Sequence, residues 1–66
     1  MTKLEQELYK RNISINMLSK ILKTHYSLIY FHVKGKVNPT VNTANKIVDA
    51  INYLRPEDQV TLGDIF

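Results

Sequence analysis

The fold is set by the segment SINMLSKILKTHYSLIYFHV, residues 14–33, which contains two short helical patterns with little chain between them. Ser14 is a favourable N-cap, because its hydroxyl can accept a hydrogen bond from a free backbone amide at the start of a helix. The apolar residues that follow recur at the spacing of one helix face: Leu18, Ile21 and Leu22. These positions predict a helix that ends near Lys23.

A second helix is predicted to begin at Thr24 or His25 and to end before Gly35, a residue that readily adopts the left-handed conformation that stops a helix. Its inward-facing residues are expected to be Leu28, Ile29 and Val33. Two short helices joined by a tight turn are typical of a helix-turn-helix, which places its second helix in the major groove of DNA. The sequence therefore predicts a helix-turn-helix over this segment.

Helical signals continue on both sides of the segment. Thr2 and Glu5 match a capping box, in which the hydroxyl and the carboxylate each accept a hydrogen bond from a backbone amide. They predict a helix over about Lys3–Arg11. On the other side, Thr40 can cap the longest helix, which its apolar spacing extends to about Leu54.

The size and composition are typical of one small globular domain. The chain has 66 residues, 44% hydrophobic and 23% charged, and no cysteine, so packing alone must hold it together. Its end, Val60–Phe66, has a cap residue and apolar side chains that can pack back on the core. We expect a single all-α domain over residues 1–66, a compact bundle of four helices plus a short C-terminal helical turn that contains the helix-turn-helix.

Basic residues are concentrated in the first three quarters of the chain. Residues 1–48 carry eight Lys or Arg and two Glu, whereas residues 49–66 carry one Arg and four acidic residues. This concentration of positive charge favours binding to the phosphate backbone of a nucleic acid. The start of the chain lacks the apolar core of a signal peptide, and no apolar run is long enough to cross a bilayer, which predicts a cytoplasmic protein with no membrane partner.

No residue pattern indicates catalysis. The sequence has no Ser/His/Asp set and no glycine-rich phosphate loop. His25 and His32 can share a helix face, but they have no acidic neighbour and so make a poor metal site. We expect a binding protein that is not an enzyme and needs no metal or cofactor.

The stretch from Ile13 to Thr40 resembles the Cro/phage-repressor (Xre-type) family of helix-turn-helix proteins. The matching positions align without gaps: Ile13, Ser14, Leu18, Leu22, Ile29, Gly35, Asn38 and Pro39. The resemblance continues through Ile47, Ala50 and the last residues, Val60–Phe66. Residues around Tyr53–Gln59 look like an insertion relative to the compact family end.

The departures from the family pattern are informative. Ile15 replaces a glutamine that touches a phosphate in the family, so Asn16 becomes the substitute candidate. Lys23 replaces the turn glycine and predicts either a less left-handed turn or a strained one. Leu8 and Val33 replace a buried Arg–Glu pair. Joint replacement by packed aliphatic residues is often neutral or favourable, which supports the alignment.

The resemblance implies a sequence-specific transcriptional regulator that binds double-stranded operator DNA as a homodimer, through the helix at about residues 25–33. The expected base contacts are Tyr26, Ser27, Tyr30 and Phe31. The expected contacts to the DNA backbone are Asn16, Lys23, Thr24, His25, Lys34, Lys36, Asn38 and Thr40. The expected dimer interface, unless these residues only close the monomer core, is Tyr53, Leu54, Val60, Leu62, Ile65 and Phe66.

The sequence is also compatible with a second function for the surface of the expected recognition helix. The expected recognition helix has few of the Arg, Asn and Gln side chains that read bases with two hydrogen bonds. Base reading would then depend on tyrosine hydroxyls, apolar contacts with thymine methyl groups and DNA shape. Its aromatic character also suits protein binding, so the alternative is an antirepressor or modulator that binds a partner repressor through Tyr26, Tyr30 and Phe31.

Overall fold

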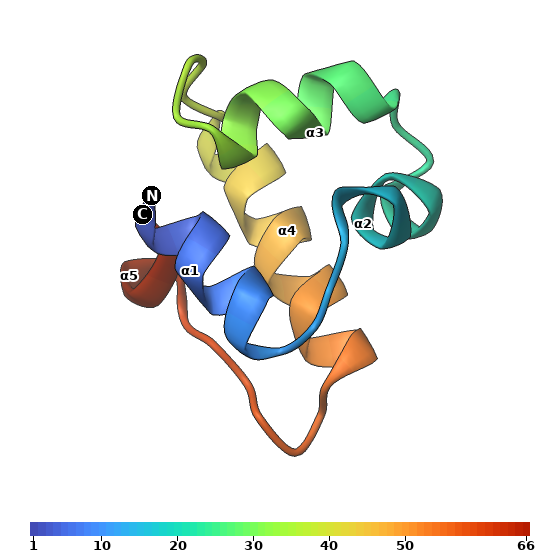
Figure 1. The fold of residues 1–66 in the computed structure, drawn as a ribbon, viewed down its shortest axis with the longest axis vertical. Coiled ribbons are helices and arrows are strands. Elements are labelled where there is room, and N and C mark those ends of the chain that lie inside the picture. The colour runs from blue at the N-terminus through green and yellow to red at the C-terminus, as the bar shows by residue number, and fades with distance from the viewer.

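The computed structural model describes residues 1–66 and consists of five helices without strands (Figure 1). The helices are α1 (Lys3–Lys10), α2 (Ile15–Leu22), α3 (Tyr26–Val33), α4 (Val41–Leu54) and α5 (Leu62–Ile65). The prediction of an all-α fold is confirmed, and each predicted helix is present with small differences at its ends. No helix is both long enough and apolar enough to cross a membrane.

The helices begin where the sequence places its caps. The hydroxyls of Thr2, Ser14 and Thr40 each accept a hydrogen bond from the amide three residues later, at 3.0, 3.1 and 3.3 Å. At Thr2 the hydroxyl forms its part of the predicted capping box, and the Glu5 carboxylate forms an ion pair with Lys34. Thr2 Oγ1 also donates to the carbonyl oxygen of Val33 at 2.6 Å, which ties the start of α1 to the end of α3.

The first three helices share one way of ending. Each is followed by a residue with positive φ: Asn12 at 56°, Lys23 at 54° and Gly35 at 76°. The amide of that residue and the amide after it donate to carbonyl oxygens three and five residues earlier, as in a Schellman motif. Gly and Asn adopt this conformation with little strain, whereas the Cβ of a lysine opposes it. The prediction that Gly35 stops α3 is confirmed.

The apolar core lies between the helices. α2 packs against α3 and α4, while α1 packs against α5, so the two ends of the chain are neighbours (Figure 1). The fully buried large side chains are Leu4, Leu18, Ile29, Val33, Ile47 and Ile51. Leu8 and Val33 both belong to this core.

The structure overturns one burial prediction and decides between two alternatives for two further residues. Leu28, expected to face inward, is 44% exposed. His32 faces inward in its place, with its Nδ1 2.9 Å from the carbonyl oxygen of Val37. Val60 and Ile65, expected at a dimer interface, are buried in the core of the single chain because α5 and the segment before it fold back onto α1 and α4.

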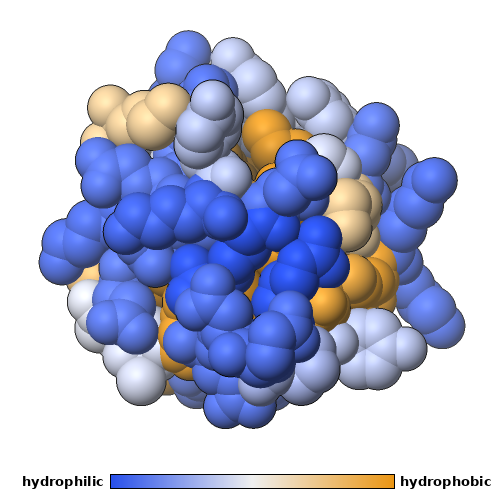
Figure 2. Space-filling view, turned by 60° about the horizontal axis from the view of Figure 1, so that its bottom comes forward, coloured by the Kyte–Doolittle hydropathy of each residue, from blue (hydrophilic) through white to orange (hydrophobic).

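The end of the molecule opposite α3 is held together by polar side chains. Arg11 is only 8% exposed, and its guanidinium donates to Glu7 Oε1 at 2.8 Å and to Asp58 Oδ1 at 3.0 Å. Asn52 forms two hydrogen bonds with the backbone of Val60, at 2.7 and 3.1 Å. Figure 2 shows this end from below, where hydrophilic residues cover most of the surface.

Candidate nucleic-acid interface

The turn between α2 and α3 consists of Lys23, Thr24 and His25. Lys23 has φ 54° and ψ 43°, so the turn keeps the left-handed geometry that suits glycine, and of the two predicted outcomes the strained turn is correct. The turn and the end of α2 form a shallow hollow without hydrophobic residues. Its lining residues are Ser19, Lys20, Lys23, Thr24 and His25.

The exposed surface of α3 is aromatic and uncharged. Its sequence, YSLIYFHV, contains no Asp, Glu, Lys or Arg. Tyr26 and Phe31 are 48% and 40% exposed, Ser27 is exposed, and Tyr30 is half-buried. The Tyr26 and Tyr30 rings are stacked with centroids 6.2 Å apart, and Phe31 meets Tyr30 edge-on at 5.9 Å. The four predicted base contacts therefore form one continuous surface, together with Leu28.

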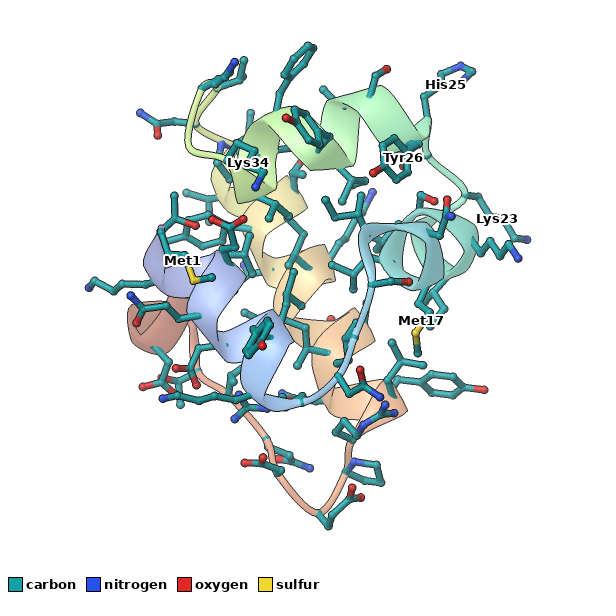
Figure 3. All side chains as sticks on the ribbon, in the orientation of Figure 1. Met1, Met17, Lys23, His25, Tyr26 and Lys34 are labelled. Atoms are coloured by element: carbon teal, nitrogen blue, oxygen red, sulfur yellow. The ribbon has the colours of Figure 1, made fainter.

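Lys34 differs from the other lysines around α3 because it already has an acidic partner. Its ammonium group forms an ion pair with Glu5 and lies 5.8 Å from the centre of the Tyr30 ring. The hydrogen bond between the two side chains lowers the pKa of the Glu5 carboxyl and raises the pKa of Lys34. Figure 3 shows Lys34 at one end of α3, above α1, and Lys23 and His25 extending outward at the other end.

The charged side chains at the two ends of the molecule differ in whether they have partners. The lysines that flank α3 without an ion-pair partner are Lys20, Lys23 and Lys36. Acidic side chains gather in the segment between α4 and α5, at the far end in Figure 1, where Glu57 and Asp58 are exposed. The α3 end therefore combines an uncharged central surface with free positive charges on both sides.

The other predicted backbone contacts have mixed environments. Asn16 and Asn38 are exposed, on α2 and in the loop after α3. The Thr40 hydroxyl accepts the amide of Thr43 and donates to its hydroxyl, so it is occupied as the cap of α4. Lys20 is the residue that the sequence reasoning missed, and the signal was present, because it precedes Lys23 by one helical turn.

The predicted dimer residues do not share one surface. Leu62 and Phe66 line a shallow apolar pocket with Pro39, Val41 and Ala44. Tyr53 is exposed over a separate hollow beside Ile21 and Leu22 of α2, and Leu54 is half-buried against the core.

Comparisons of the chain with protein-family models, with curated proteins and with solved structures give no match. No group of three or more His, Cys, Asp or Glu side chains is placed to hold a metal ion.

Proposed function

We propose that the chain is a sequence-specific DNA-binding regulator of transcription, a Cro-like repressor that inserts α3 into the major groove of operator DNA. The observation that carries this proposal is the charge distribution around α3. An exposed, uncharged helix is flanked by Lys20 and Lys23 at its start and by Lys36 after its end, and the Glu5 carboxylate beside the end of α3 is neutralised by Lys34. Phosphates on the two sides of the groove would meet these cations.

The proposed roles follow from position along α3. Tyr26, Ser27, Tyr30 and Phe31 face the base edges. Lys23, Thr24 and His25 contact phosphates at one side of the groove, together with Lys20, and Lys36 and Asn38 contact them at the other side. Lys34 is proposed to hold the Tyr30 ring in place through the contact between its ammonium group and the ring face.

A homodimer is part of the proposal, because one helix of eight residues offers few base contacts. Two half-sites about one helical turn apart would multiply the affinity. The exposed apolar residues Val41, Leu62 and Phe66 are the proposed contact surface. We also propose that the protein acts in the cytoplasm, and that it acts by binding and not by catalysis.

The test is a binding titration by fluorescence anisotropy with DNA fragments that flank the gene itself, at two salt concentrations. Tyr30→Ala should abolish selective binding, and Lys36→Ala should reduce the slope of log affinity against log salt by about one. Tyr9→Ala and Lys10→Ala are matched controls on α1, an exposed tyrosine and an exposed lysine outside the proposed DNA-binding surface, and should leave both quantities unchanged.

A second candidate function is an antirepressor or modulator that binds a partner repressor protein through the α3 surface. The observation that favours it is the absence of charge on α3, together with the exposed Leu28 and Phe31. Such a protein would show only weak, nonselective DNA binding in the titration. Its affinity for the partner repressor should fall with Phe31→Ala and be indifferent to Lys36→Ala.

A further inference from the structure

The side chains on α3 offer very few hydrogen-bonding groups to a base edge. In the major groove, guanine is read by Arg or Lys and adenine by Asn or Gln, each through two hydrogen bonds to one base. α3 contains none of these residue types, and its exposed polar groups are the hydroxyls of Ser27 and of the two tyrosines. A hydroxyl makes single hydrogen bonds and discriminates poorly among bases.

The same helix exposes apolar groups that are held in place. Leu28 and Phe31 are three residues apart, one helical turn, and are 44% and 40% exposed. Phe31 rests edge-on against Tyr30, and the Tyr30 ring also stacks on Tyr26 and lies near the Lys34 ammonium group. These contacts limit the ways in which the Phe31 ring can turn away from a partner, so its exposed edge is a preorganised apolar contact.

We propose that α3 recognises thymine through its 5-methyl group, with Phe31 and Leu28 as the specificity-determining residues. The thymine methyl is the apolar feature that a standard base presents in the major groove. This inference rests on the proposed function. The DNA sites that the protein prefers should have A·T pairs opposite the middle of α3. Hydroxyls and phosphate contacts then orient the helix, and the methyl contacts choose the sequence.

The test compares DNA that contains thymine with DNA that contains deoxyuridine. Duplexes are first selected from a random pool, and the tightest binder is resynthesised with deoxyuridine in place of thymidine at single positions. This exchange removes the methyl group and keeps every hydrogen bond of the base pair. Each contacted methyl should be worth about a four-fold loss of affinity, and uncontacted positions should show none.

Protein variants separate methyl contact from a general effect of deoxyuridine on DNA shape. Phe31→Ala should bind thymine DNA more weakly and should lose the preference for thymine over deoxyuridine at one position. Leu28→Ala should lose the preference at another position. Phe31→Leu, which keeps an apolar contact and conserves most of the packing on Tyr30, should retain part of the preference, and Tyr9→Ala should retain all of it. Circular dichroism confirms that each variant is folded.

The outcomes distinguish this inference from the proposed function. Selective, salt-dependent binding with equal affinity for thymine and deoxyuridine DNA would overturn the methyl contact and leave the DNA-binding function standing. A thymine preference that survives in Phe31→Ala and Leu28→Ala would assign it to DNA shape and would also overturn the inference. If no duplex is selected from the pool, the proposed function fails, and the inference fails with it.

Discussion

The two ends of the molecule use their polar side chains differently. At the end where α1 and α4 terminate, Arg11 contacts Glu7, Asp58 and the carbonyl oxygen of Asp58. Arg55 donates to three carbonyl oxygens at the ends of α1 and α4. At the α3 end, Lys20 and Lys23 have no acidic partner. The charges at the first end stabilise the fold, whereas Lys20 and Lys23 at the second end are available to a partner.

This contrast implies that stability and binding depend on separate residues. Substitutions at the first end should change the free energy of unfolding and leave the DNA affinity of the folded protein unchanged. Substitutions that remove the charge of a free lysine around α3 should lower the DNA affinity.

Arg11→Met should have the largest effect, a loss of about 3 kcal/mol in the free energy of unfolding, because the carbonyl oxygens of Glu7 and Asp58 and the Glu7 carboxylate lose the buried guanidinium that donates to them. Urea unfolding measures it. Lys10→Met removes an exposed ion pair with the same Glu7 and is the matched control, for which little change is expected. If Arg11→Met and Lys10→Met lose equal free energy of unfolding, Arg11 does not stabilise the fold more than an exposed ion pair does.

Asn52→Ala should cost about 2 kcal/mol, because the amide and carbonyl of the buried Val60 both lose their partner. Hydrogen exchange should show faster exchange in residues 55–66 and little change in α2 and α3. Asn45→Ala, at an exposed position of α4, serves as the comparison and should be neutral or slightly stabilising. An unchanged exchange rate around Val60 would argue against this role of Asn52.

Lys23→Gly should raise the free energy of unfolding by up to about 1 kcal/mol, since glycine relieves the left-handed strain, while it weakens DNA binding through the lost charge. The two effects have opposite signs, which a thermal melt and a DNA titration measure together. Lys20→Gln removes a neighbouring charge from regular helix and should weaken binding without any gain in stability. If Lys23→Gly is destabilising, the strain argument is wrong.

The smallest effect is the response to acid. The pKa of Glu7 is lowered mainly by its hydrogen bond with Arg11, that of Asp64 by the amide of Thr61, and that of Glu5 by Lys34. A lowered pKa in the folded state means that the ionised group stabilises the fold. This stability is complete above the unfolded values of about 4 and is lost as the pH falls through the lowered values. Melting temperatures should therefore be flat near neutral pH and fall below about pH 4, less steeply in Glu7→Gln.

Local features of this fold could be read from the sequence. The caps at Thr2, Ser14 and Thr40 and the stop at Gly35 depend on atoms within a few residues, so composition and spacing were enough. The sequence could not predict which side of α3 is buried, because YSLIYFHV is apolar nearly all round and has no helical periodicity of apolar and polar residues. Leu28 was therefore expected on the buried side, although it is 44% exposed.

Contacts between distant segments could not be predicted. The Arg11 and Asp58 side chains that form an ion pair are 47 residues apart in the sequence, and those of Lys34 and Glu5 are 29 apart. No local sequence pattern predicts which distant residues will pair. The same limit applies to the last residues, where Val60 and Ile65 are buried and Leu62 and Phe66 are exposed. All four are apolar, so only the path of the folded chain decides which of them close the core.

The contact between α1 and α5 makes the chain suitable for circular permutation. A short glycine-containing linker could join Phe66 to Met1, and new ends could be opened at the exposed turn of Pro56 and Glu57. The permuted chain would keep every helix and move both ends to the side away from α3 (Figure 1). A reporter, or a second copy fused in tandem, could then be attached there without crowding the α3 surface.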